Sequence, residues 1–231
     1  MKNVIVALMT CCLLLAGSAI AAKKDDAYKI DKRTFKSTYK TIAFAPVDAD
    51  PYLQMTDSVA AMLEAEVTAR LQKRGYTVIP SSVLAGIRKT MEAQVGGFKD
   101  PNSGRINLAK MQAVREHAFR ELWFQHKFDA MALISVRVRK VDMESDRAEW
   151  DGAKQKIAHE GRTKQYAGSI SVTSVTLAIF DPTDKPLFVF YGGLESLMYR
   201  NKDQLLPLAV NQLFLNEKRI RKAAQIAAGP I

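Results

Sequence analysis

Cysteine and histidine are almost absent from this sequence, and their scarcity excludes the common metal sites. The two cysteines, Cys11 and Cys12, lie inside an apolar run at the N-terminus. Of the three histidines, His117 and His126 are nine residues apart in an expected helix, which places them on nearly opposite faces, and His159 lies in a separate segment. A zinc site needs several such ligands in one place, so we expect no metal and no cofactor.

Glycine-rich catalytic loops are also lacking. The chain has 12 glycines, but none belongs to the Gly-x-Ser-x-Gly turn that presents the nucleophile of many hydrolases. Gly96-Gly97 is followed by neither a lysine nor a helix cap at the spacing that a phosphate-binding loop requires. The sequence therefore predicts a protein that is not an enzyme.

Three carboxylates keep an enzymatic alternative open. Asp142, Glu144 and Asp146 alternate along an expected strand and its continuation, so they could line one face. Two of them in a cleft would suit an envelope hydrolase or a cation site. The other interpretation is a solvated edge strand, where charge discourages unwanted pairing. A small-molecule carrier with a pocket between sheet and helices is a further alternative.

The first 21 residues have the three parts of a secretory signal peptide. Lys2 supplies the positive start, residues 4–15 form an apolar run broken only by Thr10, and Ala19 and Ala21 supply the small residues that a signal peptidase reads. The run is too short for a stable transmembrane helix, which needs about 20 apolar residues. We therefore expect cleavage of residues 1–21, loss of both cysteines, and a soluble periplasmic protein.

Two alternatives concern the same segment. It could remain as an uncleaved anchor, or the protein could be a lipoprotein acylated at Cys11, because residues 8–11 have some likeness to a lipid-attachment box. Thr10 is a poor residue before an acylated cysteine, and cleavage there would leave Leu13-Leu14-Leu15 exposed on the mature end. Both features favour cleavage near Ala21.

Basic residues outnumber acidic ones. The chain has 34 Lys and Arg against 24 Asp and Glu, a net charge of +10, and Lys2 is the only one of these charges in the leader. In a cytosolic protein this excess would suggest nucleic acid, which an exported protein rarely meets. We therefore expect an envelope protein as partner, with an anionic membrane surface as the alternative, and no nucleic acid.

Hydrophobic periodicity divides the mature chain into strands and helices. Residues 22–40 are expected to be an extended polar lead-in, and residues 41–231 a single domain with a charged insertion near 146–167. Strands are expected over 41–46, 76–80, 129–141, 168–180 and 186–191, and helices over 56–75, from 81 or 82 onward, 107–126 and 205–224, the last with a basic end at 218–222. This order predicts an α/β (α+β) fold, in which helices pack on a mixed, mostly antiparallel sheet.

The order of elements and several sequence features resemble a family of bacterial envelope domains. The features are the opening strand Thr41 to Pro46, the helix that runs into residues 71–80, the strand near Asp129, and the hairpin Val175 to Phe190, whose turn has Asp184-Lys185 in place of the usual glycine. The family includes the amino-terminal domain of the Tol-system propeller protein, the curli-secretion lipoprotein and lipoprotein activators of penicillin-binding proteins. The resemblance covers roughly residues 41–191 and implies a domain that binds other envelope proteins and is not an enzyme.

The candidate binding residues fall into two groups. Arg137, Arg139 and Lys140 form a basic stripe at strand spacing, which is either a solvated face or a docking surface for an acidic partner or a phospholipid surface. Trp150-Asp151-Gly152 is the most unusual group, because a tryptophan in a charged segment is either an interface residue or a satellite core residue.

Residues 146–167, which contain that tryptophan, carry nine charges and only Trp150, Ile157 and Tyr166 as sizeable apolar groups. Burial of three side chains contributes at most about 6–9 kcal/mol, whereas ordering some twenty residues costs about 1–2 kcal/mol each. We therefore expect this segment, a hairpin extension or a loop, to be dispensable for folding. With the basic stripe it would form the binding surface of a non-enzymatic binding or assembly-accessory protein.

Processing of the leader gives the first testable prediction. The exported protein should begin at Ala22, or within a residue or two of it, and should fractionate with the soluble periplasm. Intact mass of the exported form measures this. A mass equal to that of the whole chain, or an N-terminal diacylglyceryl-cysteine, would contradict the localisation.

Overall fold

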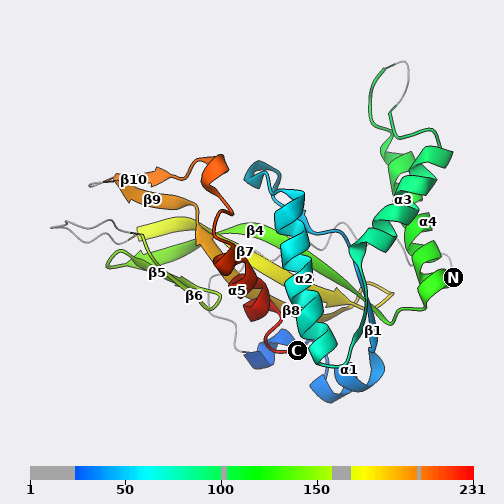
Figure 1. The fold of residues 1–231 in the computed structure, drawn as a ribbon, viewed down its shortest axis with the longest axis horizontal. Helices are drawn as coiled ribbons and strands as arrows, with labels where there is room; N and C mark the ends of the chain where they lie inside the picture. The colour runs from blue at the N-terminus through cyan, green and yellow to red at the C-terminus, as the bar shows by residue number, and fades with distance from the viewer. Residues whose placement is uncertain (1–23, 100–102, 158–167, 202–203) are drawn as a thin grey trace.

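An eight-stranded mixed sheet runs along the molecule in a computed structural model that describes residues 24–99, 103–157, 168–201 and 204–231 (Figure 1). Its centre is an antiparallel pair of long strands, β4 (Ala130–Glu144) and β7 (Gly168–Phe180), paired from Met131 opposite Phe180 to Met143 opposite Gly168. β8 (Pro186–Ser196) pairs with the other side of β7. The two long strands were predicted from their apolar runs, and the structure confirms them.

The second edge of β4 is shared by three short strands in turn. β1 (Thr41–Phe44) and β2 (Asp48–Ala49) pair with its first half in parallel, and β5 (Arg147–Trp150) pairs with its end in the antiparallel sense. β3 (Thr77–Ile79) lies parallel to β1, and β6 (Ala153–Lys156) completes a hairpin with β5. The result is a single packed domain with a mixed sheet, which confirms the expected fold class.

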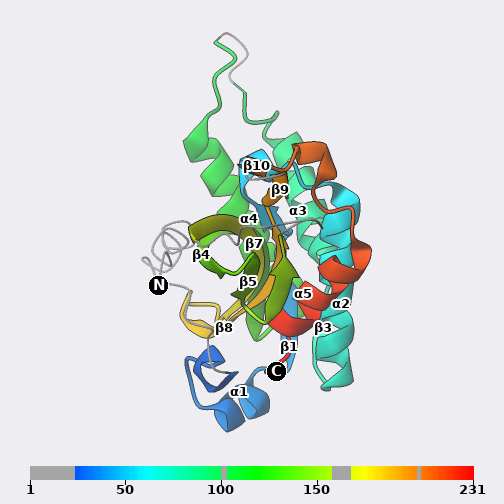
Figure 2. The ribbon, with the colours of Figure 1, turned by 90° about the vertical axis from the view of Figure 1, so that its left-hand side faces the viewer.

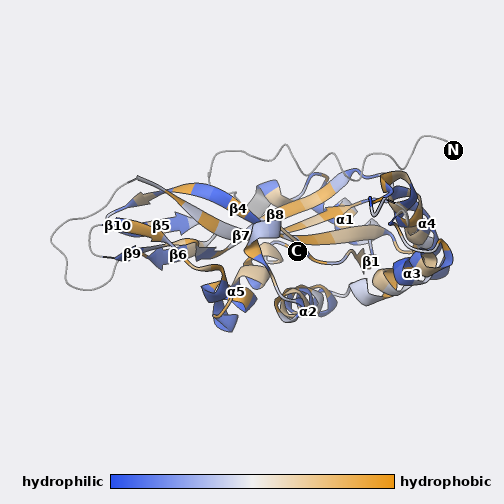
Figure 3. Ribbon diagram, turned by 90° about the horizontal axis from the view of Figure 1, so that it is seen from above, coloured by the Kyte–Doolittle hydropathy of each residue, from blue (hydrophilic) through white to orange (hydrophobic). Residues whose placement is uncertain are grey.

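Helices cover the two faces of the sheet differently. α2 (Asp57–Lys73) and α5 (Glu217–Ala227) lie side by side on one face, over the largest apolar cluster (Figures 2 and 3). α3 (Ser81–Gln94) and α4 (Leu108–His126) form a hairpin at one end of the sheet, against the opposite face of β1 and β3. Among the described residues, no helix has the length and apolar character that crossing a membrane requires.

The bounds of α2 follow from its local sequence. The Thr56 hydroxyl accepts the Val59 N–H at 3.4 Å and caps the start of the helix. Gly75, with a φ of 85°, takes the left-handed conformation after its end. The buried residues between them are every fourth one: Val59, Leu63, Val67 and Leu71. The structure confirms this helix within two residues at its C-terminal end.

The polar lead-in is the first correction, because the described part of residues 22–40 is not extended. It forms two short elements, η2 (Lys24–Ala27) and α1 (Lys32–Thr38). Phe35 of α1 is fully buried, and its ring lies 5.4 Å from that of Tyr28 and 6.4 Å from that of Phe188 in β8, measured between centroids. A single buried ring produces no periodic pattern, so hydrophobic periodicity does not reveal this helix; the local signal is Asp31, which caps its start by accepting the Thr34 N–H at 2.9 Å.

The last helix is the second correction, because α5 begins at residue 217 instead of 205. The preceding residues form a separate two-stranded hairpin and a 3-10 turn: β9 (Met198–Asn201), β10 (Gln204–Pro207) and η4 (Val210–Gln212). The helix starts after Asn216, whose side chain accepts the Arg219 N–H at 3.1 Å. The apolar spacing between 205 and 214 happens to fit a helix, and pairing across the β9–β10 hairpin overrides it.

The charged insertion near 146–167 contains a β-hairpin in its described part. β5 and β6 are joined at Asp151-Gly152 and curl toward the outer edge of β8, where the Gly193 N–H donates to the Asp151 carbonyl at 2.9 Å. The curled hairpin covers an apolar cluster that includes Trp150. The remainder of the expected insertion, residues 158–167, lies outside the described residues.

β8 continues through Gly192-Gly193, beyond its expected end at Tyr191, and other elements approach it closely from both faces there. A Cβ atom on Gly192 would lie 1.9 Å from the Ala223 carbonyl oxygen of α5. A Cβ atom on Gly193 would lie 2.4 Å from the Trp150 carbonyl oxygen of β5. Both distances are far below van der Waals contact, so neither position accepts a side chain without displacing a neighbouring backbone.

Substitution of these glycines tests the packing. Gly192→Ala and Gly193→Ala should each lower the free energy of unfolding by about 3 kcal/mol or more, because the added methyl group meets backbone atoms and, at Gly193, also the Ala153 methyl group and the buried Trp150 ring. Gly86→Ala is the control, since Gly86 lies within α3 with nothing within 4 Å of an added Cβ, and it should gain about 0.5–1 kcal/mol. Urea denaturation measures all three. A Gly192→Ala protein as stable as wild type would contradict the close approach of α5.

Candidate functional site

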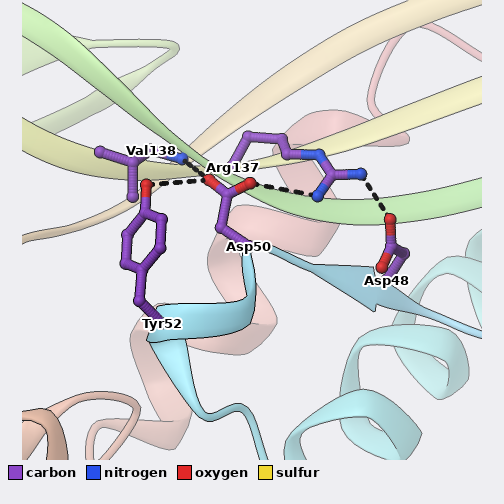
Figure 4. Close-up of polar contacts among 5 residues, drawn as sticks. All are labelled: Asp48, Asp50, Tyr52, Arg137 and Val138. Carbon is purple, nitrogen blue, oxygen red and sulfur yellow. Dashed lines mark hydrogen bonds and ion pairs between the residues drawn. The ribbon is translucent and has the colours of Figure 1, made fainter. Parts of the chain in front are cut away.

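The predicted basic stripe is divided by the structure, and Arg137 is held by two acidic side chains. Its guanidinium donates to Asp48 at 2.5 Å and to Asp50 at 3.2 Å (Figure 4). Asp50 also accepts the Val138 N–H at 2.8 Å and the Tyr52 hydroxyl at 3.3 Å. Arg137 therefore links β4 to β2 and to the turn that follows β2.

Arg139 has a similar structural role two residues further along β4. It pairs at 2.7 Å with Asp151, whose carboxylate also accepts the Ser174 hydroxyl at 2.7 Å. The Arg139 guanidinium carbon lies 4.8 Å from the centroid of the Tyr191 ring. These contacts anchor the turn of the β5–β6 hairpin, and Lys140 is the exposed member of the predicted stripe.

Trp150 is a satellite core residue, which is the second of the two interpretations of this tryptophan. The side chain is only 4% exposed, and its indole N–H donates to the Thr173 carbonyl at 3.0 Å. Gly152 is exposed, with a φ of 76°, and Ile226 of α5 lies 3.1 Å from where its Cβ would be. β5 and β6 are thus packed elements of the sheet, and the dispensability of residues 146–167 for folding stays a prediction.

The three alternating carboxylates do not form a cluster. Asp142 and Glu144 are exposed, whereas Asp146 is buried and pairs with the buried Arg200 at 2.5 Å. No group of three or more histidine, cysteine or acidic side chains in the described residues could hold a metal ion.

A groove with a basic lining lies between β6 and the start of α5. It consists of two adjoining hollows of about 260 and 310 Å³, which share Gln155, Asn216 and Arg219. Five cations line it from its two walls: Lys154 and Lys156 of β6, and Lys218, Arg219 and Lys222 of α5. Lys154 also makes a surface ion pair with Glu149 at 2.5 Å. We refer to this region as the basic groove.

The floor of the basic groove is apolar. Trp150 and Leu194 line one hollow and Ile157 the other, and all three are almost fully buried. The cationic side chains around them are exposed. A ligand in the groove would therefore meet charge at its rim and apolar surface beneath it.

The cations of α5 occupy an unfavourable position for the helix itself. Lys218 and Arg219 lie in its first turn and Lys222 in its second, near the positive end of the helix dipole. Arg221 is compensated by Glu66 at 2.7 Å, but within the described part of the chain no acidic side chain lies at ion-pair distance from the other three. An anion in the groove would offset both these charges and the dipole.

Glu195 is the acidic residue in the lining. Its side chain accepts the Phe214 N–H at 2.8 Å and so ties the segment before α5 to β8. Burial raises the pKa of Glu195 above its usual value, and the Phe214 N–H and the Arg219 guanidinium oppose this rise. The residue is 6% exposed, so a charged carboxylate here is costly to the folded protein.

None of the groove cations was among the predicted site residues. The basic run 218–222 was expected at the C-terminal end of a helix, where cations suit the dipole. Asn216 is the sequence feature that indicates a helix start at residue 217, because asparagine is one of the preferred residues before the first turn of a helix. The lysines of β6 become part of the site only through the curl of the hairpin, which local sequence does not encode.

Comparisons with known proteins add little to this geometry. No protein-family model matches the chain, and no curated protein matches its sequence. One similar solved structure is described as that of a neuraminyllactose-binding hemagglutinin homologue from Helicobacter pylori. It is 11% identical, the match covers 90% of this chain and 86% of that chain, and the TM-score is 0.33, too low to support an argument about fold or function.

Glu195→Gln gives a pH-dependent prediction. Because the folded pKa of Glu195 lies above its ordinary value of 4.5, its contribution to stability falls as the pH rises from that value through the folded pKa. Glutamine keeps an oxygen acceptor for Phe214 and carries no charge. The melting temperature of the variant should therefore exceed that of wild type by an amount that grows across this range and then levels off. A difference that does not change between pH 4 and pH 8 would contradict the raised pKa.

Proposed function

We propose that this protein is a non-enzymatic, periplasmic binding or assembly-accessory protein of the bacterial envelope, and that the basic groove holds an acidic segment of a partner protein. The observation that carries the proposal is the convergence of five cations, from β6 and from α5, around an apolar floor. The signal peptide expected over residues 1–21 supports the periplasmic location, and the net charge of +10 supports an acidic partner.

The rim and the floor supply different parts of the binding free energy. Exposed cations such as Lys218 and Lys222 attract an acidic chain and accelerate its association, an effect that salt screens. The buried side chains of the floor favour apolar groups, which displace water from Trp150 and Leu194. The segment that fits best therefore has acidic residues on both sides of an apolar one.

The lining also bears on the two alternatives. Five cations and one buried carboxylate, Glu195, form its charged groups. This composition suits recognition of an anion, whereas glycoside hydrolysis requires two carboxylates facing one bond. A hollow of about 260 Å³ is smaller than most small-molecule pockets, and it adjoins a second hollow of about 310 Å³, so that the two together offer room for a peptide segment.

Binding of a model peptide tests the groove. A fluorescein-labelled peptide of alternating glutamate and leucine should bind the processed protein in low salt, and a lysine–leucine peptide of the same length should not. Lys218→Gln/Lys222→Gln should weaken binding about tenfold, which corresponds to about 1.4 kcal/mol. Fluorescence anisotropy measures the dissociation constants.

The matched control is Lys73→Gln/Lys89→Gln, which removes the same charge from exposed positions on α2 and α3. It should change the affinity by less than twofold. Lys140→Gln separately tests the exposed residue of the stripe predicted from the sequence. Equal losses in the groove and control variants would mean that net charge alone attracts the peptide, and the proposed site would be wrong.

A further inference from the structure

The last turn of α4 exposes two consecutive aromatic side chains. Trp123 is 43% exposed and Phe124 is 68% exposed. The Lys127 ammonium group lies 4.2 Å from the centroid of the Trp123 ring and 4.6 Å from that of the Phe124 ring. Lys127 is fixed after the helix in a left-handed conformation, where its N–H donates to the Trp123 carbonyl at 2.8 Å. We refer to these three residues as the aromatic–lysine cluster.

The cluster does not take part in the packing of α4 on the domain. The buried face of the helix consists of Val114, Ala118 and Leu122. At about 100° per residue, Trp123 and Phe124 lie about 100° and 200° away from Leu122 around the helix axis. They therefore project from the flank and from the back of the helix.

Exposed apolar groups are concentrated in the α3–α4 hairpin. It holds five of the eight large apolar side chains that the described residues expose: Val95, Ile106, Leu108, Trp123 and Phe124. The same part of the chain, residues 81–127, carries eight Lys and Arg against four Asp and Glu. Exposed apolar and basic side chains in the same region favour contact with a surface that presents both apolar and anionic groups.

We infer that the aromatic–lysine cluster is a contact site for an anionic phospholipid surface. Aromatic rings, tryptophan above all, are favoured at the level of the lipid headgroups. The Lys127 ammonium group, held beside both rings, can reach lipid phosphates while the rings enter the headgroup region. Leu108 is about 60° from Trp123 around the helix axis, so with α4 lying along the surface it enters on the same side.

This site is separate from the basic groove. The α3–α4 hairpin lies at one end of the long axis of the molecule, and β5 and β6 lie toward the other (Figures 1 and 3). A protein held to lipid by α4 therefore keeps its groove free for a partner. The inference does not depend on the proposed function, and each can fail without the other.

Vesicle binding tests the cluster. The processed protein should sediment with equimolar phosphatidylglycerol and phosphatidylcholine vesicles and much less with phosphatidylcholine alone. The emission of Trp123 should shift to the blue, while Trp150, the other tryptophan of the chain, is buried throughout and serves as a constant background. Trp123→Ser/Phe124→Ser should lower the partition coefficient at least tenfold, and Trp123→Phe should abolish the blue shift but keep most of the binding.

Two controls separate this site from other surfaces. Val210→Ser removes an exposed apolar side chain that lies outside both the hairpin and the lining of the groove, and it should leave binding within twofold of wild type. Lys218→Gln/Lys222→Gln tests whether the groove binds headgroups. Loss of binding in the groove variant alone, equal binding to both kinds of vesicle, or no binding at all would overturn the inference. The inference would also be overturned if the wild-type protein self-associated in the absence of lipid and the Trp123→Ser/Phe124→Ser variant did not.

Discussion

The close approach of two backbones to β8 at Gly192 and Gly193 is the constraint on which the rest of this structure depends. α5 packs on one face of the strand, with its backbone against Gly192, and β5 packs on the other, with the Trp150 carbonyl and the Ala153 methyl group against Gly193. Ala223 and Ala227 of α5 are fully buried at this contact and have only methyl groups to accommodate. Because α5 and the β5–β6 hairpin form the walls of the basic groove, the two glycines also set its width.

Three arginines extend this arrangement into segments that have little apolar surface. Arg137 holds β2, Arg139 holds the turn of the β5–β6 hairpin, and Arg200 holds the start of β5 through Asp146. A buried ion pair adds little net stability over an apolar pair, but the loss of one partner is expensive. β5 and β6, the described part of the charged insertion, therefore fold as part of the sheet, although their own apolar residues are too few to offset the loss of conformational entropy.

Much of the fold could be predicted, because its central elements have strong local patterns. The apolar runs of β4 and β7 and the four-residue spacing of α2 are typical of their structures, and the Asn107 cap marks the start of α4. The contacts that complete the core and the site are not local. Phe35 is buried by β8, far along the chain, and Arg139 meets Asp151 only because the hairpin curls. An error of twelve residues at the start of α5 was then enough to assign the basic run to the wrong end of a helix.

The distribution of charge follows from the same packing. Arg137, Arg139 and Arg200 are compensated by carboxylates within the sheet. The two basic sites lie elsewhere, between β6 and the start of α5 and after the end of α4. Along β7, the groove lies beside Ser174, the partner of Gly193, whereas the α3–α4 hairpin lies near Phe180, the partner residue of Met131. Six residues of strand separate these positions by about 20 Å, roughly twice the Debye length in 0.1 M salt. The two basic sites are therefore electrostatically almost independent, and an acidic ligand at one does not neutralise the other.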